Sequence, residues 1–242
     1  MTKEITFEKN IDNFDHDARE LSGYVYTGKD KLSSVISNEH ITDVILSLMS
    51  FRGKDVIDIG CGDGTYTIDI MRLGKPRSIL GFDPSAEAIK VARRKTRGLK
   101  KIKFATANIY TYSTTKKFDI AVVRGVLHHL YQPEKAIRQI RKLARKVIIA
   151  EPNGYNPVLK VIEKTSRYHR EHEEKSYLPY ALDYWIKKNG GTIKRKRFAG
   201  IVPFFCPDWL AHLLRSVENF VEHTPILNWL LCGSYYVVYN NN

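Results

Sequence analysis

Cysteine is scarce in this chain of 242 residues. The three cysteines, Cys61, Cys206 and Cys232, lie far apart in the sequence, and no C-x-x-C pair is present. An odd number of cysteines at wide spacing gives neither a disulfide framework nor a zinc ribbon. We therefore expect a protein of the reducing cytoplasm that holds no metal ion.

Long apolar runs are also missing. No segment approaches the roughly 18 consecutive apolar residues that a membrane-spanning helix requires. The first ten residues contain Lys3, Glu4, Glu8 and Lys9, which precludes the apolar core of a signal peptide. These two absences predict a protein that is neither exported nor membrane-spanning.

Acidic residues are too few to balance the basic ones. The chain has 26 Asp and Glu against 39 Lys and Arg, which gives a formal net charge of +13. Such a balance raises the affinity for polyanions, including RNA and anionic lipid. The basic residues are spread over expected helix faces and loop edges, however, and charge runs of that kind are usually solvated. Nucleic acid is an alternative partner that is not favoured, peripheral membrane contact stays open, and no stable protein partner is inferred.

Strand-like and helix-like segments alternate along most of the chain. The predicted strands span 55–59, 78–83, 102–106, 118–124, 146–150, 192–198 and 235–239. The predicted helices span 65–73, 86–96, 133–143, 181–188 and 208–221, with Ser85 as the N-cap of the second. This alternation predicts an α/β fold of the Rossmann-like, doubly wound type, with a mostly parallel seven-stranded sheet and an antiparallel C-terminal edge strand.

The segment 56–65 is the most informative one, because a buried strand ends there in a glycine-rich turn before a helix. Glycines at such a point let the backbone pass close to a bound nucleoside. The dinucleotide pattern G-x-G-x-x-G fails, since the sixth position from Gly60 is Thr65. Asp58 at the strand end would repel a diphosphate and tolerate a cation. S-adenosylmethionine carries a positively charged sulfonium and an amino group, so its charge is of the sign that Asp58 tolerates.

Three ordered motifs carry a family resemblance. They are the run 58–64 with its glycines, the run 81–85 around Asp83, and the run 118–121 followed by Leu-His-His-Leu at 127–130. From about residue 54 to residue 152 the chain resembles a class I S-adenosylmethionine-dependent methyltransferase, in the branch that acts on small molecules. The resemblance implies that S-adenosylmethionine is the cofactor and that S-adenosylhomocysteine is the product.

The cofactor contacts are predicted partly from physics and partly from this resemblance. Asp83 ends a strand about 20 residues after the glycines, where an acid can accept both ribose hydroxyls. Asp58 either satisfies turn amides or orders the methionine end of the cofactor. Asn108 stands where similar enzymes often carry an Asp that binds adenine, and its alternative is an Asx turn. The predicted cofactor-binding residues are Asp58, Gly60, Cys61, Gly62, Asp83, Pro84, Asn108, Ile109 and Arg124.

Two histidines at the exit of the fourth strand are the candidate catalytic residues. His128 and His129 are expected near the transferred methyl, and either could accept a proton from the acceptor, with His129 favoured. The alternative is that they only form the pocket wall. Arg124 beside them could contact the cofactor carboxylate. In-line methyl transfer depends chiefly on orientation, so no catalytic triad is required.

The remaining segments are expected to bind the acceptor. Residues 1–50 are predicted as an N-terminal helical lid, and residues 51–242 as a methyltransferase domain with a substrate-side insertion at about 154–180. Within that insertion, 168–174 places His and Glu one helical turn apart, but it lacks H-E-x-x-H, and a solvated helix is favoured over a metal site.

The sequence thus predicts a methyltransferase for a small or medium-sized acceptor that is lipid-like or aromatic. Two alternatives stay open. An RNA methyltransferase is suggested by the charge, although no RNA-binding module is present. A non-catalytic module that only binds S-adenosylmethionine is the other. Neither the acceptor atom nor the oligomeric state follows from the sequence.

Overall fold

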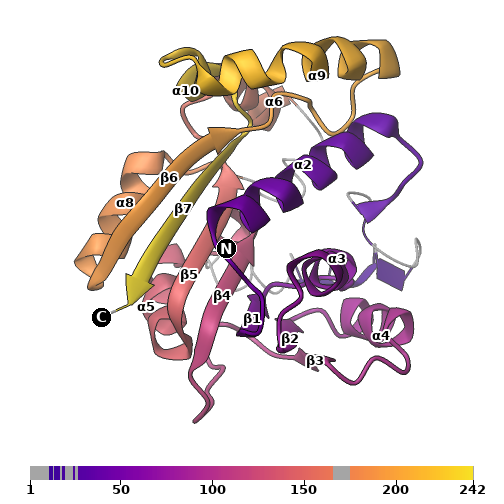
Figure 1. Ribbon diagram of the computed structural model, residues 1–242, viewed down its shortest axis with the longest axis vertical. Helices are drawn as coiled ribbons and strands as arrows, with labels where there is room; N and C mark the ends of the chain where they lie inside the picture. Colours follow the sequence, from indigo (N-terminus) through magenta and orange to yellow (C-terminus); the bar gives the residue numbers. More distant parts are fainter. Residues whose placement is uncertain are drawn as a thin grey trace.

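The computed structural model describes residues 11–12, 14–16, 18–19, 24, 27–165 and 175–241. Its centre is a seven-stranded sheet in the order β3-β2-β1-β4-β5-β7-β6 (Figure 1). The strands are β1 (Asp55–Ile59), β2 (Ser78–Asp83), β3 (Ile102–Thr106), β4 (Phe118–Arg124), β5 (Ala144–Pro152), β6 (Gly191–Ala199) and β7 (Ser234–Asn241).

The first five strands are parallel to one another. Each connection between them crosses over the sheet, so that every one of these strands starts from the same end of it. β7 runs antiparallel to both β5 and β6. The predicted fold class is therefore confirmed, including the antiparallel C-terminal strand. That strand lies one position inside the sheet, and β6 forms the edge, since β7 pairs on both sides.

Helices cover both faces of the sheet (Figure 1). They are α2 (Leu32–Leu48), α3 (Thr65–Gly74), α4 (Ala86–Lys95), α5 (Pro133–Leu143), α6 (Pro157–Thr165), α8 (Pro179–Lys188), α9 (Asp208–His223) and α10 (Leu227–Leu231), with a short 3-10 helix, η2 (Leu127–His129). Buried side chains of α5 and α8 pack on one face, and those of α2, α3 and α4 pack on the other. This two-sided burial explains the continuous apolar runs of the central strands.

Most predicted elements are confirmed to within a few residues. Ser85 caps α4, because its hydroxyl accepts a hydrogen bond from the Ala88 amide at 3.0 Å. Within the predicted insertion at about 154–180, α6 ends at Thr165, and the His and Glu pattern at 168–174 lies outside the described residues. None of the helices in the described ranges has both the length and the hydrophobicity that a membrane span requires.

Candidate cofactor and acceptor site

The glycine-rich turn joins β1 to α3 in a conformation that requires glycine. Gly60 and Gly64 have φ values of +69° and +77°, which are unfavourable for residues with a side chain. A Cβ atom on Gly60 would lie 2.5 Å from a methyl carbon of Val126. The amides of Gly60 and Cys61 donate to the carbonyl of Phe82, which holds the turn against β2. The turn is thus fixed close to the strand that carries Asp83.

A cavity of about 610 Å³ opens at the carboxyl ends of the parallel strands. Parallel sheets bind their ligands at this edge, where the strand order reverses between β1 and β4. One side of it, which we call the cofactor wall, consists of residues 60–63, 83–84, 109, 124–126 and 128–130. The other side, the helical wall, consists of residues from α2, α6 and α9 and of the loop 200–205.

Nine of the predicted site residues line this cavity. They are Gly60, Cys61, Gly62, Asp83, Pro84, Ile109, Arg124, His128 and His129. Asp58 and Asn108 are not among the lining residues. The predicted residues of the glycine turn and the strand ends thus lie around one cavity, whereas the side chains of Asp58 and Asn108 do not line it.

Asp83 lies at the centre of the cofactor wall. Its carboxylate accepts hydrogen bonds of 2.9 Å from the amides of Gly62 and Ser85. Burial raises the pKa of Asp83 to about 6, against these two hydrogen bonds, which lower it. A buried acid held by backbone amides at the cavity wall suits the hydroxyls of a ribose, as the sequence predicts.

Asp58 lies behind the turn. Its carboxylate accepts a hydrogen bond of 2.5 Å from the Thr67 hydroxyl on α3. Burial raises its pKa to about 6, while the Thr67 hydrogen bond and the charge of Arg124 lower it. Asp58 thus bonds a side chain and not the turn amides, and it is not among the residues that line the cavity. Its contact with the methionine end of the cofactor stays a prediction. Its position supports the helix that follows the turn.

Asn108 adopts the alternative that the sequence left open. Its side-chain oxygen accepts a hydrogen bond of 2.9 Å from the Tyr110 amide, two residues on, which is an Asx turn. The local hydrogen bond directs this oxygen to its own backbone. Ile109, the next residue, lines the cavity and is buried.

Arg124 connects the end of β4 to α2. Its guanidinium donates to the hydroxyl of Thr42 at 2.8 Å and to the side-chain oxygen of Asn38 at 2.9 Å. It also stacks on the ring of Tyr66, with 3.5 Å to the ring centroid. The guanidinium therefore positions the helical wall against the sheet while it lines the cavity.

His128 is held by a buried carboxylate. Glu151, at the end of β5, accepts hydrogen bonds from the amides of Val126 and Leu127 through one oxygen. Its other oxygen lies 2.8 Å from Nδ1 of His128 and accepts from the His128 amide. Because a carboxylate accepts, Nδ1 carries the proton, and the lone pair of the neutral ring is then on Nε2. Both side chains line the cavity.

His129 has a different environment. Its ring packs edge-on against Phe14, with 5.1 Å between centroids, and lies 3.9 Å from the ring of His128. The site therefore has one histidine paired with a buried carboxylate and a second that contacts aromatic rings.

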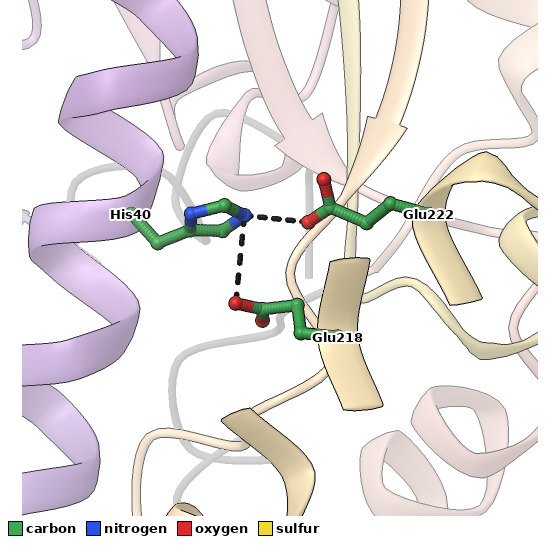
Figure 2. Close-up of side chains that lie close together, drawn as sticks. All are labelled: His40, Glu218 and Glu222. Atoms are coloured by element: carbon green, nitrogen blue, oxygen red, sulfur yellow. Dashed lines mark hydrogen bonds and ion pairs between the residues drawn. The ribbon is translucent and has the colours of Figure 1, made fainter. Parts of the chain in front are cut away.

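A buried ion cluster holds the helical wall together (Figure 2). Nε2 of His40 on α2 lies 2.5 Å from Glu222 and 3.7 Å from Glu218, both on α9. Arg197 donates to Glu222 at 2.9 Å, and Arg215 contacts Glu218. The amides of Gly200 and Ile201 also donate to these carboxylates. Each of the four carboxylate oxygens of Glu218 and Glu222 thus has a donor from the protein. Because no oxygen is left for a metal ion, this arrangement is an ion cluster and not a metal site.

Asp63 joins the N-terminal part of the chain to the glycine turn. Its carboxylate accepts from the Thr27 hydroxyl at 2.7 Å and from Lys95 at 2.8 Å. Although burial opposes it, these donors lower the pKa of Asp63. The ring of Tyr24 lies against Gly62, where a Cβ atom would be 2.6 Å away. Tyr24 and Thr27, which lie in the segment predicted as a lid, therefore contact the cofactor wall.

Sequence reasoning missed Glu151 and the polar residues of α2. The signal for Glu151 is its place at the carboxyl end of a parallel strand adjacent to β4. No comparable signal exists for Asn38 or His40, because their partners lie 86 and 182 residues away along the chain.

Comparison with known proteins agrees with this geometry. The family model described as a methyltransferase domain matches residues 50–193, more than half of the chain. Over 130 residues the chain is 28% identical to a probable cobalt-precorrin-6B C(15)-methyltransferase of Thermoplasma acidophilum, with 51% of this chain and 64% of the relative covered. Over 112 residues it is 30% identical to a tRNA U34 carboxymethyltransferase of Campylobacter fetus, with 40% and 35% covered. The chain spans less than two thirds of either relative.

A solved structure extends the similarity to the whole fold. Magnesium protoporphyrin IX methyltransferase from Synechocystis PCC 6803, with bound S-adenosylhomocysteine, superposes with a TM-score of 0.68 at 16% identity, and the match covers 100% of both chains. The glycine turn, the buried Asp83 and the cavity above them fit the nucleoside of that ligand class. The chain therefore belongs to the class I methyltransferase-domain family, whose cofactor is S-adenosylmethionine.

Proposed function

We propose that this protein methylates a small or medium-sized acceptor with an apolar, lipid-like or aromatic body, and that His128 is the general base. The observation that carries the proposal is the His128–Glu151 pair in the cavity wall, which orients a basic nitrogen beside the cofactor wall. The relatives are named for acceptors as different as tetrapyrroles and tRNA, so the lining of the cavity is the better guide to the acceptor of this protein.

Each part of the cavity has a role in this reaction. Asp83, Pro84 and Ile109 would hold the nucleoside end of the cofactor, which supplies an electrophilic methyl group on a sulfonium. An acceptor lone pair forms the new bond to the methyl carbon as the carbon–sulfur bond breaks. Nε2 of His128 takes the acceptor's proton, and Glu151 stabilises the imidazolium that results.

Two observations favour His128 over His129 as the base. Nδ1 of His128 lies 2.8 Å from the Glu151 carboxylate, whereas the ring of His129 packs against Phe14. The same carboxylate accepts three amides of residues 126–128, so the His128 ring and its loop are fixed by one group. A fixed ring keeps its basic nitrogen in position at no further entropic cost.

The helical wall supports an apolar acceptor. Leu159, Ile162, Val202 and Phe204 line it, and Leu130 of the cofactor wall lines the same cavity. A water-soluble polyanion such as RNA would find few polar partners there. This composition favours the small-molecule proposal over RNA methylation.

Labelled cofactor incubated with a cell extract, followed by identification of the labelled product, tests the proposal. With the identified acceptor, His128→Asn should lower kcat by on the order of 10²–10⁴-fold and leave cofactor affinity in calorimetry unchanged. Glu151→Gln should lower kcat less and shift the pH profile of kcat, because it changes the basicity of His128.

His129→Asn is the matched control, since it removes an imidazole from the same helical turn. Equal losses of kcat in the His128 and His129 variants would contradict the assignment of the base. Label recovered only in RNA would contradict the small-molecule proposal, and cofactor binding without any labelled product would point to a non-catalytic module.

A further inference from the structure

Helix α9 buries two acidic residues and exposes several large apolar ones, which is the reverse of an ordinary surface helix. Such helices bury an apolar stripe and expose charged residues. In α9 the side chains of Glu218 and Glu222 are buried, whereas Trp209 and Phe220 are 68% and 67% exposed. Leu213 and Val217 are exposed between them, at helical spacing. The exposed side of α9 thus carries an apolar stripe along its length, beside exposed polar residues that include His212, Ser216 and Asn219.

The apolar surface continues onto two neighbouring helices. α10 packs between α9 and α6, and Figure 1 shows α9 and α10 along one end of the molecule with α6 beneath them. Trp229, Leu230 and Leu231 of α10 are 43–53% exposed, and Val158 and Val161 of α6 are 55% and 60% exposed. We call this surface of α6, α9 and α10 the apolar helix face. Its size exceeds the scattered exposure that is normal for a protein surface.

The apolar helix face backs directly onto the cavity. α6 has apolar residues on two sides: Val158 and Val161 are exposed, whereas Leu159 and Ile162 line the cavity. Phe205, in the loop that leads to α9, also lines the cavity and is 44% exposed. An apolar molecule at this surface is therefore separated from the acceptor side of the cavity by a single helix and loop.

Charge and residue type indicate what the face contacts. Among the acids of α9 only Asp208 is exposed, α10 has no charged residue, and Lys164 and Arg215 are exposed beside the apolar residues. The whole chain carries a net charge of +13. Exposed Trp, Phe and Leu next to basic groups are typical of helices that lie in the interface of an anionic membrane.

We propose that the apolar helix face docks on an anionic membrane surface and that the acceptor is an apolar molecule taken from that membrane. The second half of this statement rests on the proposed function, whereas the docking itself does not. Trp209, Phe220 and Trp229 enter the interface, and the α6 side of the cavity then faces the acyl region. This geometry delivers a membrane-dissolved acceptor to His128 without its passage through water.

Flotation with vesicles tests the docking without any measurement of methyl transfer. Full-length protein is mixed with phosphatidylcholine vesicles that contain or lack phosphatidylglycerol. We expect binding to the anionic vesicles that falls at least about tenfold in the variant Trp209→Ser/Phe220→Ser/Trp229→Ser, because each aromatic side chain adds apolar area to the interface. The matched control is Leu73→Ser/Leu99→Ser, which removes two side chains that are 50% and 51% exposed on α3 and after α4.

Three outcomes would overturn the docking proposal. They are wild-type protein that does not float, a triple variant that floats as well as wild type, and equal losses in the control variant. A wild-type dimer that the triple variant dissociates, in sedimentation at matched concentration, would assign the face to a second copy of the chain instead. Calorimetric binding of S-adenosylmethionine by every variant verifies the fold. Vesicle binding that persists while the extract yields no labelled product would overturn the proposed function alone.

Discussion

The two walls of the cavity are built by different means. The cofactor wall consists mostly of turns that follow the parallel strands, and its acid Asp83 accepts from the backbone amides of two such turns, those of Ser85 and Gly62. The helical wall is assembled from distant segments through side chains, as in the contact of His40 with Glu222, 182 residues apart. One wall is local and the other depends on long-range charge contacts.

This difference matches the division of labour in the proposed reaction. A cofactor that is the same in every member of the family is bound by a short motif. An acceptor that differs among relatives is bound where the chain can change without altering the sheet. The helical wall should therefore be sensitive to loss of its buried charges, and the cofactor wall to changes of single local groups.

Glu222→Gln is expected to have the largest effect, because it removes a buried charge from the helical wall. Burial opposes ionisation of Glu222, but hydrogen bonds from His40, the Gly200 amide and Arg197 outweigh it and lower the pKa to about 2. The substitution leaves Arg197 beside a neutral group and should reduce the free energy of unfolding by about 3 kcal/mol at pH 7. Urea titration monitored by circular dichroism measures it.

The pH dependence gives a second readout of the same charge. A carboxyl group with a lowered pKa contributes stability that is present above its ordinary pKa and is lost as the pH falls toward the folded value. Wild type should therefore lose stability between about pH 4.3 and pH 2, and Glu222→Gln should lose less.

The control is Asp69→Asn, which removes an exposed ion pair with Arg72 and should change the free energy of unfolding by less than about 1 kcal/mol. Equal effects of the two variants would refute a wall held by buried charge.

The same contrast explains what could be predicted from the sequence. The mostly parallel sheet, the glycine turn and the place of Asp83 follow from consecutive residues whose spacing fixes their geometry, whereas the edge position of β6 does not. Asn108 shows where local reasoning is ambiguous, because an amide that can reach adenine can also close an Asx turn, and here it closes the turn. Asp58 lies on its strand as predicted, but the direction of its side chain depends on Thr67, nine residues later.

The helical wall could not be predicted, for a physical reason. No apolar periodicity marks the positions of the polar residues of α2. Their partners lie on β4 and α9, and these elements come close to α2 only in the folded protein. The exposed aromatics of α9 are a related difficulty. An aromatic-rich sequence is usually part of a core; Tyr235 and Tyr236 are buried, whereas Trp209 is 68% exposed.

Asp83→Asn tests the cofactor wall and is expected to have the next largest effect. It removes the charge that should accept the ribose hydroxyls and keeps the shape of the side chain. We expect affinity for S-adenosylmethionine to fall by roughly 30-fold, which corresponds to about 2 kcal/mol for hydrogen bonds to a charged group. Isothermal titration calorimetry measures it, and Asn108→Ala, outside the cavity, should bind nearly as wild type.

The raised pKa of Asp83 adds a pH prediction. Burial raises this pKa to about 6, so the carboxyl group takes up a proton as the pH falls below that value. Because the ionised form is the better acceptor, affinity of wild type should fall by up to about tenfold per pH unit below pH 6. Asp83→Asn should flatten that dependence. A slope that persists in Asp83→Asn would assign it to another group, of which Asp58 has a similar pKa.

The smallest expected effect separates backbone conformation from close packing in the glycine turn. Gly53 and Gly60 share a φ of +69°, but a Cβ atom on Gly53 meets nothing within 4 Å, whereas one on Gly60 would lie 2.5 Å from Val126. Alanine at either position incurs the left-handed backbone cost, and Gly60→Ala should destabilise the protein further, by about 1 kcal/mol, because the branched Val126 cannot turn away freely. Denaturant titrations compare the two variants, and calorimetry should show weaker cofactor binding only for Gly60→Ala. If both variants lost the same stability and the same affinity, the turn would need glycine for its backbone angles alone, and close approach to Val126 would have no part in shaping the cofactor wall.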